Sequence, residues 1–203
     1  MYLSIVSNEN YQGLNPLTFG YEDCDPGHFY GPAIRTGWLI HFVVSGHGIF
    51  RRDGIEWKVN PGEMFVIPPF EETYYEADRK KPWSYIWISF NVTGDLPCEL
   101  DHVIKCPRAR EIFEKMKNCE MLTAGKSAFL AARLWDLFSL IAEQKREKED
   151  CIKKALDCIH GEYMTGISID EIAARVHLDR TYFSVLFKKR MGVTPKEYLR
   201  ITE

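Results

Sequence analysis

Long apolar runs are missing from this chain of 203 residues. No stretch approaches the roughly 18–20 consecutive apolar residues that a membrane-spanning helix needs, so we expect no membrane partner. The first residues, Met1–Val6, lack a basic segment followed by a long apolar one, and a secretory signal is therefore not expected. Both absences favour a cytoplasmic protein.

Paired cysteines are missing as well. The six cysteines are scattered along the chain without a C-x-x-C pair. In a chain with no visible export signal, scattered cysteines are expected to be reduced thiols rather than disulfides or zinc ligands. They are Cys24, Cys98, Cys106, Cys119, Cys151 and Cys158.

A strong charge of either sign is also missing. The formal net charge is −3, and residues 151–203 carry nine Lys and Arg against seven Asp and Glu, which leaves −5 for the rest of the chain. A net +2 is a weak electrostatic attraction for nucleic acid. An acidic part joined to a mildly basic part is compatible with DNA binding, but the charge alone does not indicate it.

The most informative pattern that is present covers residues 166–198 and predicts two short helices joined by a tight turn, with a third helix behind them. Ser168 and Glu171 form an S-x-x-E capping box, so the first helix is expected to begin at Ile169. Asp179 can cap the second helix. The third begins around residues 194–197, where a proline occupies the first helical position.

The outward face of the second helix is polar and basic. A helix-turn-helix with such a face is typical of proteins that place a recognition helix in the major groove of DNA. The alternative is an ordinary pair of amphipathic helices whose lysines face solvent. The face carries Arg180, Thr181, Ser184, Lys188 and Lys189.

Residues 168–174 and 182–200 together resemble the first helix-turn-helix of AraC-type transcription regulators. The resemblance implies a bacterial transcription factor whose partner is DNA. It also implies base contacts at Thr181, Ser184 and Val185, and phosphate contacts by basic residues of the same helix. Val185 departs from the many relatives that have an arginine there; a valine can contact a thymine methyl group or lie at the edge of the core. The implied phosphate contacts are Arg180, Lys188 and Lys189, with Arg190 as a further candidate.

The N-terminal half has a different pattern, because residues 18–91 are rich in aromatic and β-branched residues and are interrupted by turns. Asp53-Gly54 predicts a hairpin, since both central positions of a type I′ turn require positive φ. Many short strands separated by turns favour a sandwich or a small barrel. The predicted strands are 38–44, 49–52, 55–59, 64–67, 73–76 and 83–90.

Gly46–Phe50, Asp53-Gly54, Pro61–Glu63 and Pro68-Pro69 resemble the cupin-type sugar-binding barrel of the same regulators over roughly residues 11–95. We therefore expect an α+β fold in four parts. These are a cupin-like ligand-binding barrel with an N-terminal arm (1–106), a helical dimerisation region (107–144), a charged linker (145–150) and the first helix-turn-helix of a DNA-binding domain (151–203).

A cupin fold raises the alternative of an enzyme with an accessory helical domain. Metal-dependent cupins need two histidines one residue apart, a later carboxylate and a third histidine. Here His41 and His47 are six residues apart, and residues 63–67 and 73–76 contain no histidine. We expect no metal, no cofactor and no catalytic residue.

The resemblance implies that the barrel binds a small molecule, most simply a sugar, at Tyr75, Tyr85 and Trp87. Tyr85 and Trp87 have the same parity on a strand, so both side chains can point inside. His41 is a candidate polar partner. Barrel packing remains the alternative for these aromatic residues, in which case the barrel serves only to dimerise.

Two further ligand contacts are implied by the resemblance. Residues 13–16 resemble the arm that closes over bound sugar, which places Asn15 near the ligand. Gly31 occupies the position of a sugar-binding arginine, and Arg35, four residues later, is the candidate to replace it. This departure favours a ligand different from arabinose.

From Arg108 onward the pattern is helical, and a helix is expected over about residues 126–144. Its apolar stripe is spaced four, three and four residues apart, which suits an antiparallel helix pair or a dimer seam. The resemblance implies a homodimer through this stripe; the alternative is that the stripe packs on the barrel. Relatives carry two helix-turn-helix units, so we expect this chain to be part of a longer protein. The stripe is Leu130, Leu134, Leu137 and Ile141.

Overall fold

The computed structural model describes residues 1–162 and 166–202. Contacts divide the chain into two compact units, Met1–Ile141 and Ala142–Glu203, and each is described by itself. Among the helices of these residues, none combines the length and the apolar character that crossing a bilayer requires.

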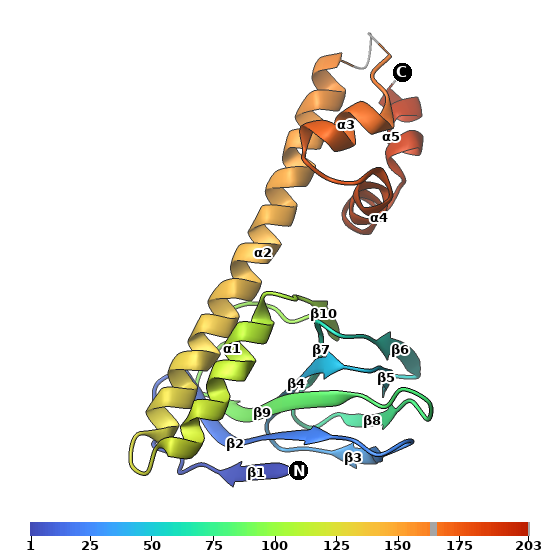
Figure 1. Cartoon of the computed structure of the whole chain (residues 1–203). Coiled ribbons are helices and arrows are strands. Elements are labelled where there is room, and N and C mark those ends of the chain that lie inside the picture. The colour runs from blue at the N-terminus through green and yellow to red at the C-terminus, as the bar shows by residue number, and fades with distance from the viewer. Residues whose placement is uncertain (163–165, 203) are drawn as a thin grey trace. The chain divides into compact units, whose positions relative to one another are not determined.

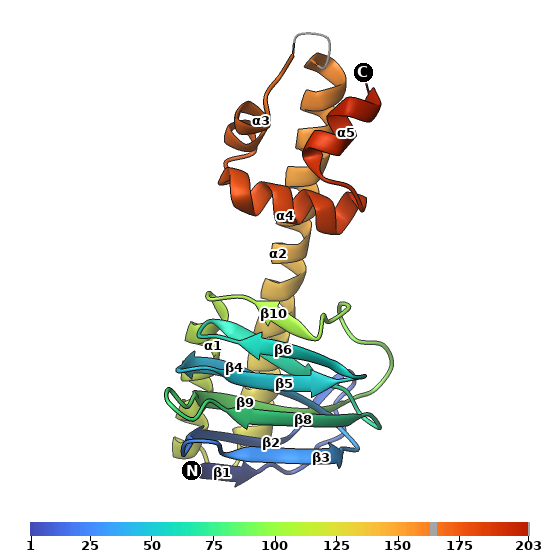
Figure 2. The ribbon, with the colours of Figure 1, turned by 90° about the vertical axis from the view of Figure 1, so that its right-hand side faces the viewer.

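The first unit contains two antiparallel sheets, in the strand orders β1-β2-β9-β4-β7-β10 and β3-β8-β5-β6 (Figures 1 and 2). The predicted hairpin at Asp53 and Gly54 is confirmed, with φ of 53° and 72°. The strands are β1 (Tyr2–Ile5), β2 (Leu14–Asp23), β3 (Phe29–Ile34), β4 (Trp38–Ser45), β5 (Gly48–Arg52), β6 (Ile55–Val59), β7 (Glu63–Ile67), β8 (Glu72–Ala77), β9 (Ser84–Val92) and β10 (Val103–Lys105).

The six-stranded sheet is buried on both faces. On β9, Ile86, Ile88 and Phe90 belong to one hydrophobic core, and Tyr85 belongs to a second one. The first core continues into α1 (Ala109–Met116), η1 (Lys117–Met121) and the first half of α2 (Lys126–Glu162), which cover that face in Figure 1. The second core lies between the two sheets. This arrangement confirms the expected α+β fold.

The apolar stripe of α2 is part of the first core. Its four residues are at most 1% exposed within a single chain, so their side chains are already surrounded by the sheet and α1. The prediction that these side chains form the contact with a second copy is therefore corrected, because a fully buried side chain has no surface left to offer. They are Leu130, Leu134, Leu137 and Ile141.

The second unit contains the rest of α2 with α3 (Ile169–Arg175), α4 (Arg180–Met191) and α5 (Pro195–Thr202). The capping box of Ser168 and Glu171 is present, and the Asp179 carboxylate accepts hydrogen bonds from the first backbone N–H groups of α4. The turn between α3 and α4 passes through His177 at a φ of 56°. Phe183 and Phe187 anchor the core that holds these helices together.

Residues 145–150, the predicted linker, lie inside α2 and are helical. Their lysine, arginine and glutamate side chains are good helix formers, so a charged run need not interrupt a helix. The boundary between the two compact units falls just before this run, between Ile141 and Ala142.

Candidate ligand cavity and DNA-binding surface

A cavity of about 550 Å³ opens in the first unit, on the face of the six-stranded sheet that is turned away from the helices. Strands β2, β4 and β9 supply one wall, and β8 and the chain around β3 supply others. The lining residues are Met1, Leu17, Thr18, Glu22, His28, Tyr30, Ile34, Arg35, Thr36, Gly37, Leu39, His41, Tyr75, Tyr85, Trp87 and Ser89.

His41 lies at the centre of the aromatic wall because it pairs in register with Trp87 on one side and Phe65 on the other. Its ring stacks on Phe65 with centroids 4.5 Å apart and meets Tyr85 edge-on at 4.8 Å. Residues that face each other across neighbouring strands point to the same side of a sheet, which brings these rings together. The expected inward direction of Tyr85 and Trp87 is thereby confirmed.

The imidazole of His41 is neutral at ordinary pH. Burial, followed by the nearby charge of Arg35, holds its pKa well below the usual value, because both effects disfavour the protonated ring. Its Nδ1 atom is buried and accepts or donates no hydrogen bond within residues 1–162 and 166–202. A neutral imidazole can both donate and accept, so His41 suits a ligand hydroxyl group.

Arg35 supplies the positive charge of the cavity. Its guanidinium lies 4.3 Å from the ring centroid of Tyr30 and 5.9 Å from that of Tyr75. These cation–π contacts hold the group in place. Its buried Nη1 atom has no hydrogen-bond partner in the part of the chain that the structure describes.

The two tyrosines keep their protons. Burial is the main cause in both cases, raising the pKa of Tyr75 to about 12 and that of Tyr85 further still. Each hydroxyl therefore keeps the proton with which it can donate a hydrogen bond. Thr18 and Ser89, whose hydroxyls bond to each other, add two more polar groups to the wall.

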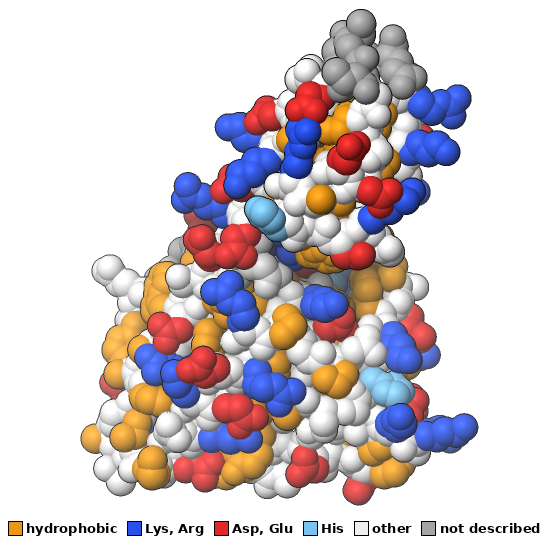
Figure 3. Space-filling view, turned by 45° about the horizontal axis from the view of Figure 1, so that its top comes forward, with side chains coloured by type: hydrophobic (Ala, Val, Ile, Leu, Met, Phe, Trp, Pro, Cys, Tyr) orange, Lys and Arg blue, Asp and Glu red, His pale blue; other side chains and the backbone are white. Residues whose placement is uncertain are grey.

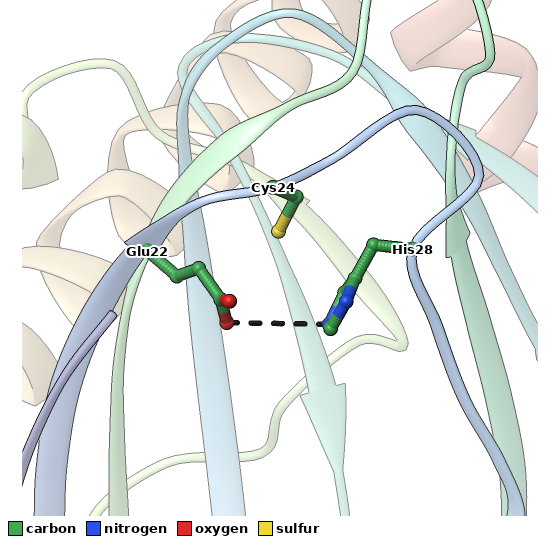
Figure 4. Close-up of side chains that lie close together, drawn as sticks. All are labelled: Glu22, Cys24 and His28. Atoms are coloured by element: carbon green, nitrogen blue, oxygen red, sulfur yellow. Dashed lines mark ion pairs between the residues drawn. The ribbon is translucent and has the colours of Figure 1, made fainter.

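One edge of the cavity carries Glu22, Cys24 and His28, which come from the end of β2 and the turn that follows it (Figure 4). The Glu22 carboxylate lies 4.0 Å from His28 Nε2 and accepts a 3.5 Å hydrogen bond from the Tyr85 hydroxyl. Burial raises the pKa of Cys24 to about 11. The sequence prediction missed these residues, and the available signal was the Asp-Pro-Gly-His turn.

Asn15 does not line the cavity. Its side-chain amide donates to the carbonyl oxygens of Tyr11 at 2.7 Å and Gly13 at 3.4 Å, so it fixes the segment that leads into β2. The expectation that Asn15 lies beside a ligand is corrected for this conformation. A short side chain that bonds to its own preceding backbone has little reach toward the cavity.

The exposed face of α4 presents most of the predicted DNA contacts. Val185 is 64% exposed and therefore does not lie at the edge of the core. A contact with DNA stays a prediction for this residue. Ser184 is half-buried, and its hydroxyl donates to the Arg180 carbonyl at 2.8 Å. Arg180 also forms a 2.9 Å ion pair with Asp170 of α3. The exposed members of the predicted set are Arg180, Thr181, Val185, Lys188 and Lys189.

Charges of both signs are interspersed on this protein. On the face that Figure 3 shows, Lys and Arg side chains alternate with acidic ones rather than forming one continuous basic area. Arg190, for example, pairs with Glu149 of α2. The acidic partners agree with the small net charge of this part of the sequence.

Two known protein families match separate parts of this chain. The AraC-like ligand binding domain matches residues 15–95, and the helix-turn-helix of bacterial regulatory proteins of the AraC family matches residues 159–200. The chain belongs to the AraC family of transcription regulators. The resemblance drawn from the sequence is thereby confirmed for both halves.

Three proteins similar to this AraC-family regulator are named as regulators of operons. The Msm operon regulatory protein of Streptococcus mutans is 27% identical over 201 residues, covering 89% of this chain and 72% of that protein. The raffinose operon transcriptional regulatory protein of Pediococcus pentosaceus is 23% identical, covering 96% and 78%. The lactose operon transcription activator of Staphylococcus xylosus is 24% identical, covering 89% and 72%. Among solved structures, apo ToxT of Vibrio cholerae is similar with a TM-score of 0.48 and 13% identity, covering 94% and 98%.

The regulator is a DNA-binding protein with a ligand-binding domain, and it is not an enzyme. Its structure gathers five of the six predicted ligand residues around one cavity and leaves Asn15 outside it. Their role in binding stays a prediction. The five are Arg35, His41, Tyr75, Tyr85 and Trp87.

Proposed function

We propose that the regulator senses a carbohydrate in the cavity of its first unit and responds by changing its occupancy of operator DNA. The observation that carries this proposal is the lining of the cavity. Trp87 offers a flat ring for the C–H face of a sugar, while Arg35, His41 and the two tyrosines offer groups that bond hydroxyls. Two relatives are named for the raffinose and lactose operons, which supports the same class of ligand.

The size of the cavity favours an oligosaccharide. About 550 Å³ lies well inside the range of roughly 300–1,000 Å³ that ligand pockets occupy, which leaves room for more than one sugar ring. We therefore place di- and trisaccharides ahead of single pentoses or hexoses as effectors.

The test is a titration with mono-, di- and trisaccharides that follows thermal stability and tryptophan fluorescence together. A sugar at 100 times its dissociation constant should stabilise the folded state by about 2.7 kcal/mol. Trp87→Leu and Arg35→Met should abolish the response, whereas Trp57→Phe, which changes a tryptophan outside the cavity lining, should retain it. Failure of every sugar to stabilise the protein would refute carbohydrate sensing and favour a barrel that only dimerises.

DNA contact is assigned to α4. Thr181, Ser184 and Val185 would meet base edges, and Arg180, Lys188 and Lys189 would meet phosphates. Replacing Lys188 by alanine should weaken binding to all sequences and lower the salt slope by about one, whereas Thr181→Ala should relax discrimination at one base pair. Fluorescence anisotropy at several salt concentrations separates the two effects. Because operator DNA lies in the bacterial cytoplasm, we place the regulator there.

We also propose that the regulator acts as a homodimer. Since the apolar stripe of α2 is used by the core, a second copy would have to contact the outward side of α2, where Trp135 is 47% exposed. Light scattering of Trp135→Glu should then report a monomer. An unchanged dimer mass would exclude this face of α2.

A further inference from the structure

Glu22, Cys24 and His28 form a compact group of three different donor types. Their carboxylate oxygen, thiol sulfur and imidazole nitrogen all lie within 4.8 Å of one another. Figure 4 shows the three side chains converging from one short stretch of chain. Carboxylate, thiolate and imidazole are each established ligands of zinc.

The backbone fixes all three positions. Glu22 pairs in register with Tyr85, and the N–H of Cys24 donates to the carbonyl of Trp83 at 3.1 Å. The chain then turns through Asp25-Pro26-Gly27-His28, where the His28 N–H donates to the Asp25 carbonyl at 3.0 Å and Gly27 has a φ of 73°. Proline followed by glycine is the signature of a type II turn.

The turn is also attached to the second sheet. The His28 carbonyl accepts a 2.8 Å hydrogen bond from the N–H of Ala77 at the end of β8. The three donors are therefore held by two sheets and a tight turn, and rotation of their side chains is the movement that would bring them closer. Tetrahedral zinc, with bonds of about 2.0–2.3 Å, needs neighbouring donors roughly 3.3–3.7 Å apart.

We propose that Glu22, Cys24 and His28 bind one divalent cation of the zinc class. The donor set decides the class, because magnesium and calcium prefer oxygen ligands and seldom accept sulfur or nitrogen. Binding joins the cation to the Cys24 sulfur and releases the thiol proton to solvent. The Glu22 carboxylate would contribute an oxygen ligand and His28 an imidazole nitrogen.

The surroundings of the sulfur suit a thiolate bound to a metal. Cys24 is 7% exposed, and it lies in the core with Trp83 and Tyr85, whose buried indole N–H and hydroxyl both lie beside the sulfur. An N–H donor and the Tyr85 hydroxyl beside the sulfur would orient it and balance its charge, as outer groups do at metal sites. Since Glu22 and His28 both line the cavity, the fourth coordination position would face the cavity.

This site differs from the metal set of catalytic cupins, which uses histidines on neighbouring barrel strands. The site contains neither a C-x-x-C pair nor two histidines one residue apart. Its three donors come together only when β2 and the turn after it fold. Its test uses no sugar, so the failure of this proposal and the failure of the carbohydrate proposal are distinguishable.

The experiment is a titration of the whole chain, stripped of metal and fully reduced, with CoCl₂ and then ZnCl₂. Cobalt should bind with one equivalent, give an absorption band from sulfur-to-cobalt charge transfer, and lose that band when zinc displaces it. Cys24→Ser should remove the band. His28→Gln, at a side chain that is 35% exposed and therefore dispensable for folding, should weaken zinc binding by roughly tenfold or more.

The matched controls are His47→Gln and Cys158→Ser, which change a histidine and a cysteine outside the group. Both should retain the band, the stoichiometry and the zinc affinity. The proposal would be overturned by the absence of a saturable one-equivalent isotherm. It would be overturned equally by a cobalt band that survives in Cys24→Ser, or by zinc affinity that is the same in His28→Gln as in the parent protein.

Discussion

Leu134→Ala distinguishes a core residue from a dimer contact. Leu134 lies on α2, is completely buried in a single chain, and belongs to the core that joins α2 to the six-stranded sheet. Truncating a buried leucine removes its apolar contacts and leaves a cavity, at a cost of about 2–5 kcal/mol. Because packed elements surround the site and limit its collapse, we expect a loss of about 3 kcal/mol.

That loss is a large share of the roughly 5–15 kcal/mol by which domains are stable. It should lower the melting temperature of the first unit by about 6–12 °C, given roughly 2–4 °C per kcal/mol for a unit of this size. Denaturation by urea, followed through tryptophan fluorescence at several protein concentrations, gives the free energy of unfolding. Sedimentation of the same samples gives the state of association.

Leu140→Ala is the matched control, since Leu140 lies on the same helix and packs only partly against the same core. Its loss should be clearly smaller, near 1 kcal/mol. The core assignment would be refuted if Leu134→Ala weakened self-association while the free energy of unfolding of the monomer stayed unchanged.

Three further outcomes follow from the structure. As pH falls below about 6.5, His41 binds a proton in the unfolded chain but not in the folded protein, where burial lowers its pKa. The free energy of unfolding should therefore decline by up to about 1.4 kcal/mol per pH unit until the pKa of the folded state is reached. Urea titrations should show that His41→Gln removes this decline and that His47→Gln, at a partly exposed side chain, does not. A Cβ on Gly20 would clash with the backbone carbonyl of Tyr2 and lie 2.6 Å from the Trp87 ring, so Gly20→Ala should cost about 1–3 kcal/mol and shift tryptophan emission; an unshifted spectrum would contradict the packing of Trp87 on Gly20. Ser168→Ala removes the cap of α3 and should cost about 1 kcal/mol in a thermal melt, and a loss near zero would mean that the cap is dispensable.

Local signals predicted the second unit well. Its three short helices begin where the capping residues Ser168, Asp179 and Thr194 indicate, because an N-cap depends only on residues two or three positions away. The end of α2 was not predicted, since the charged run at 145–150 favours a solvated linker and a helix equally. No local pattern separates the two.

Strand prediction succeeded where each strand has one clear pattern and failed where that pattern is broken. β4 and β9 are long and apolar or alternating, and both were predicted. β2 was not, because Pro16 and Gly20 weaken its strand propensity; Pro16 in fact lies at an irregularity in its pairing with β9. The contribution of β2 to the cavity, including Glu22, was missed for that reason.

The cavity itself depends on pairings that the sequence does not display. Glu22 pairs with Tyr85 on the neighbouring strand, although more than sixty positions separate them in the sequence. His41 likewise pairs with Trp87, more than forty positions later. Alternation along one strand shows which residues share a face, but not which strands are neighbours. The family resemblance supplied that missing register for Tyr75, Tyr85 and Trp87, and it misplaced Asn15, whose amide bonds to its own preceding backbone.

Two buried polar atoms in the cavity wall favour the class of ligand that we propose. The Nδ1 of His41 and the Nη1 of Arg35 make no hydrogen bond to the described protein, so a ligand can bond to them without breaking a bond within the fold. A ligand group that bonds to one of these atoms gives it the partner that it lacks in the free protein, a gain of about 0.5–1.5 kcal/mol at the neutral imidazole and about 1.5–3 kcal/mol at the charged guanidinium. Under the carbohydrate proposal, a sugar should therefore bind more tightly than its deoxy analogue by roughly 2- to 150-fold for each lost hydroxyl that bonds to one of these atoms. If the proposed ligand is correct, selectivity in this cavity should depend on the positions of hydroxyl groups, while the aromatic wall around His41 should provide affinity that sugars of different stereochemistry share.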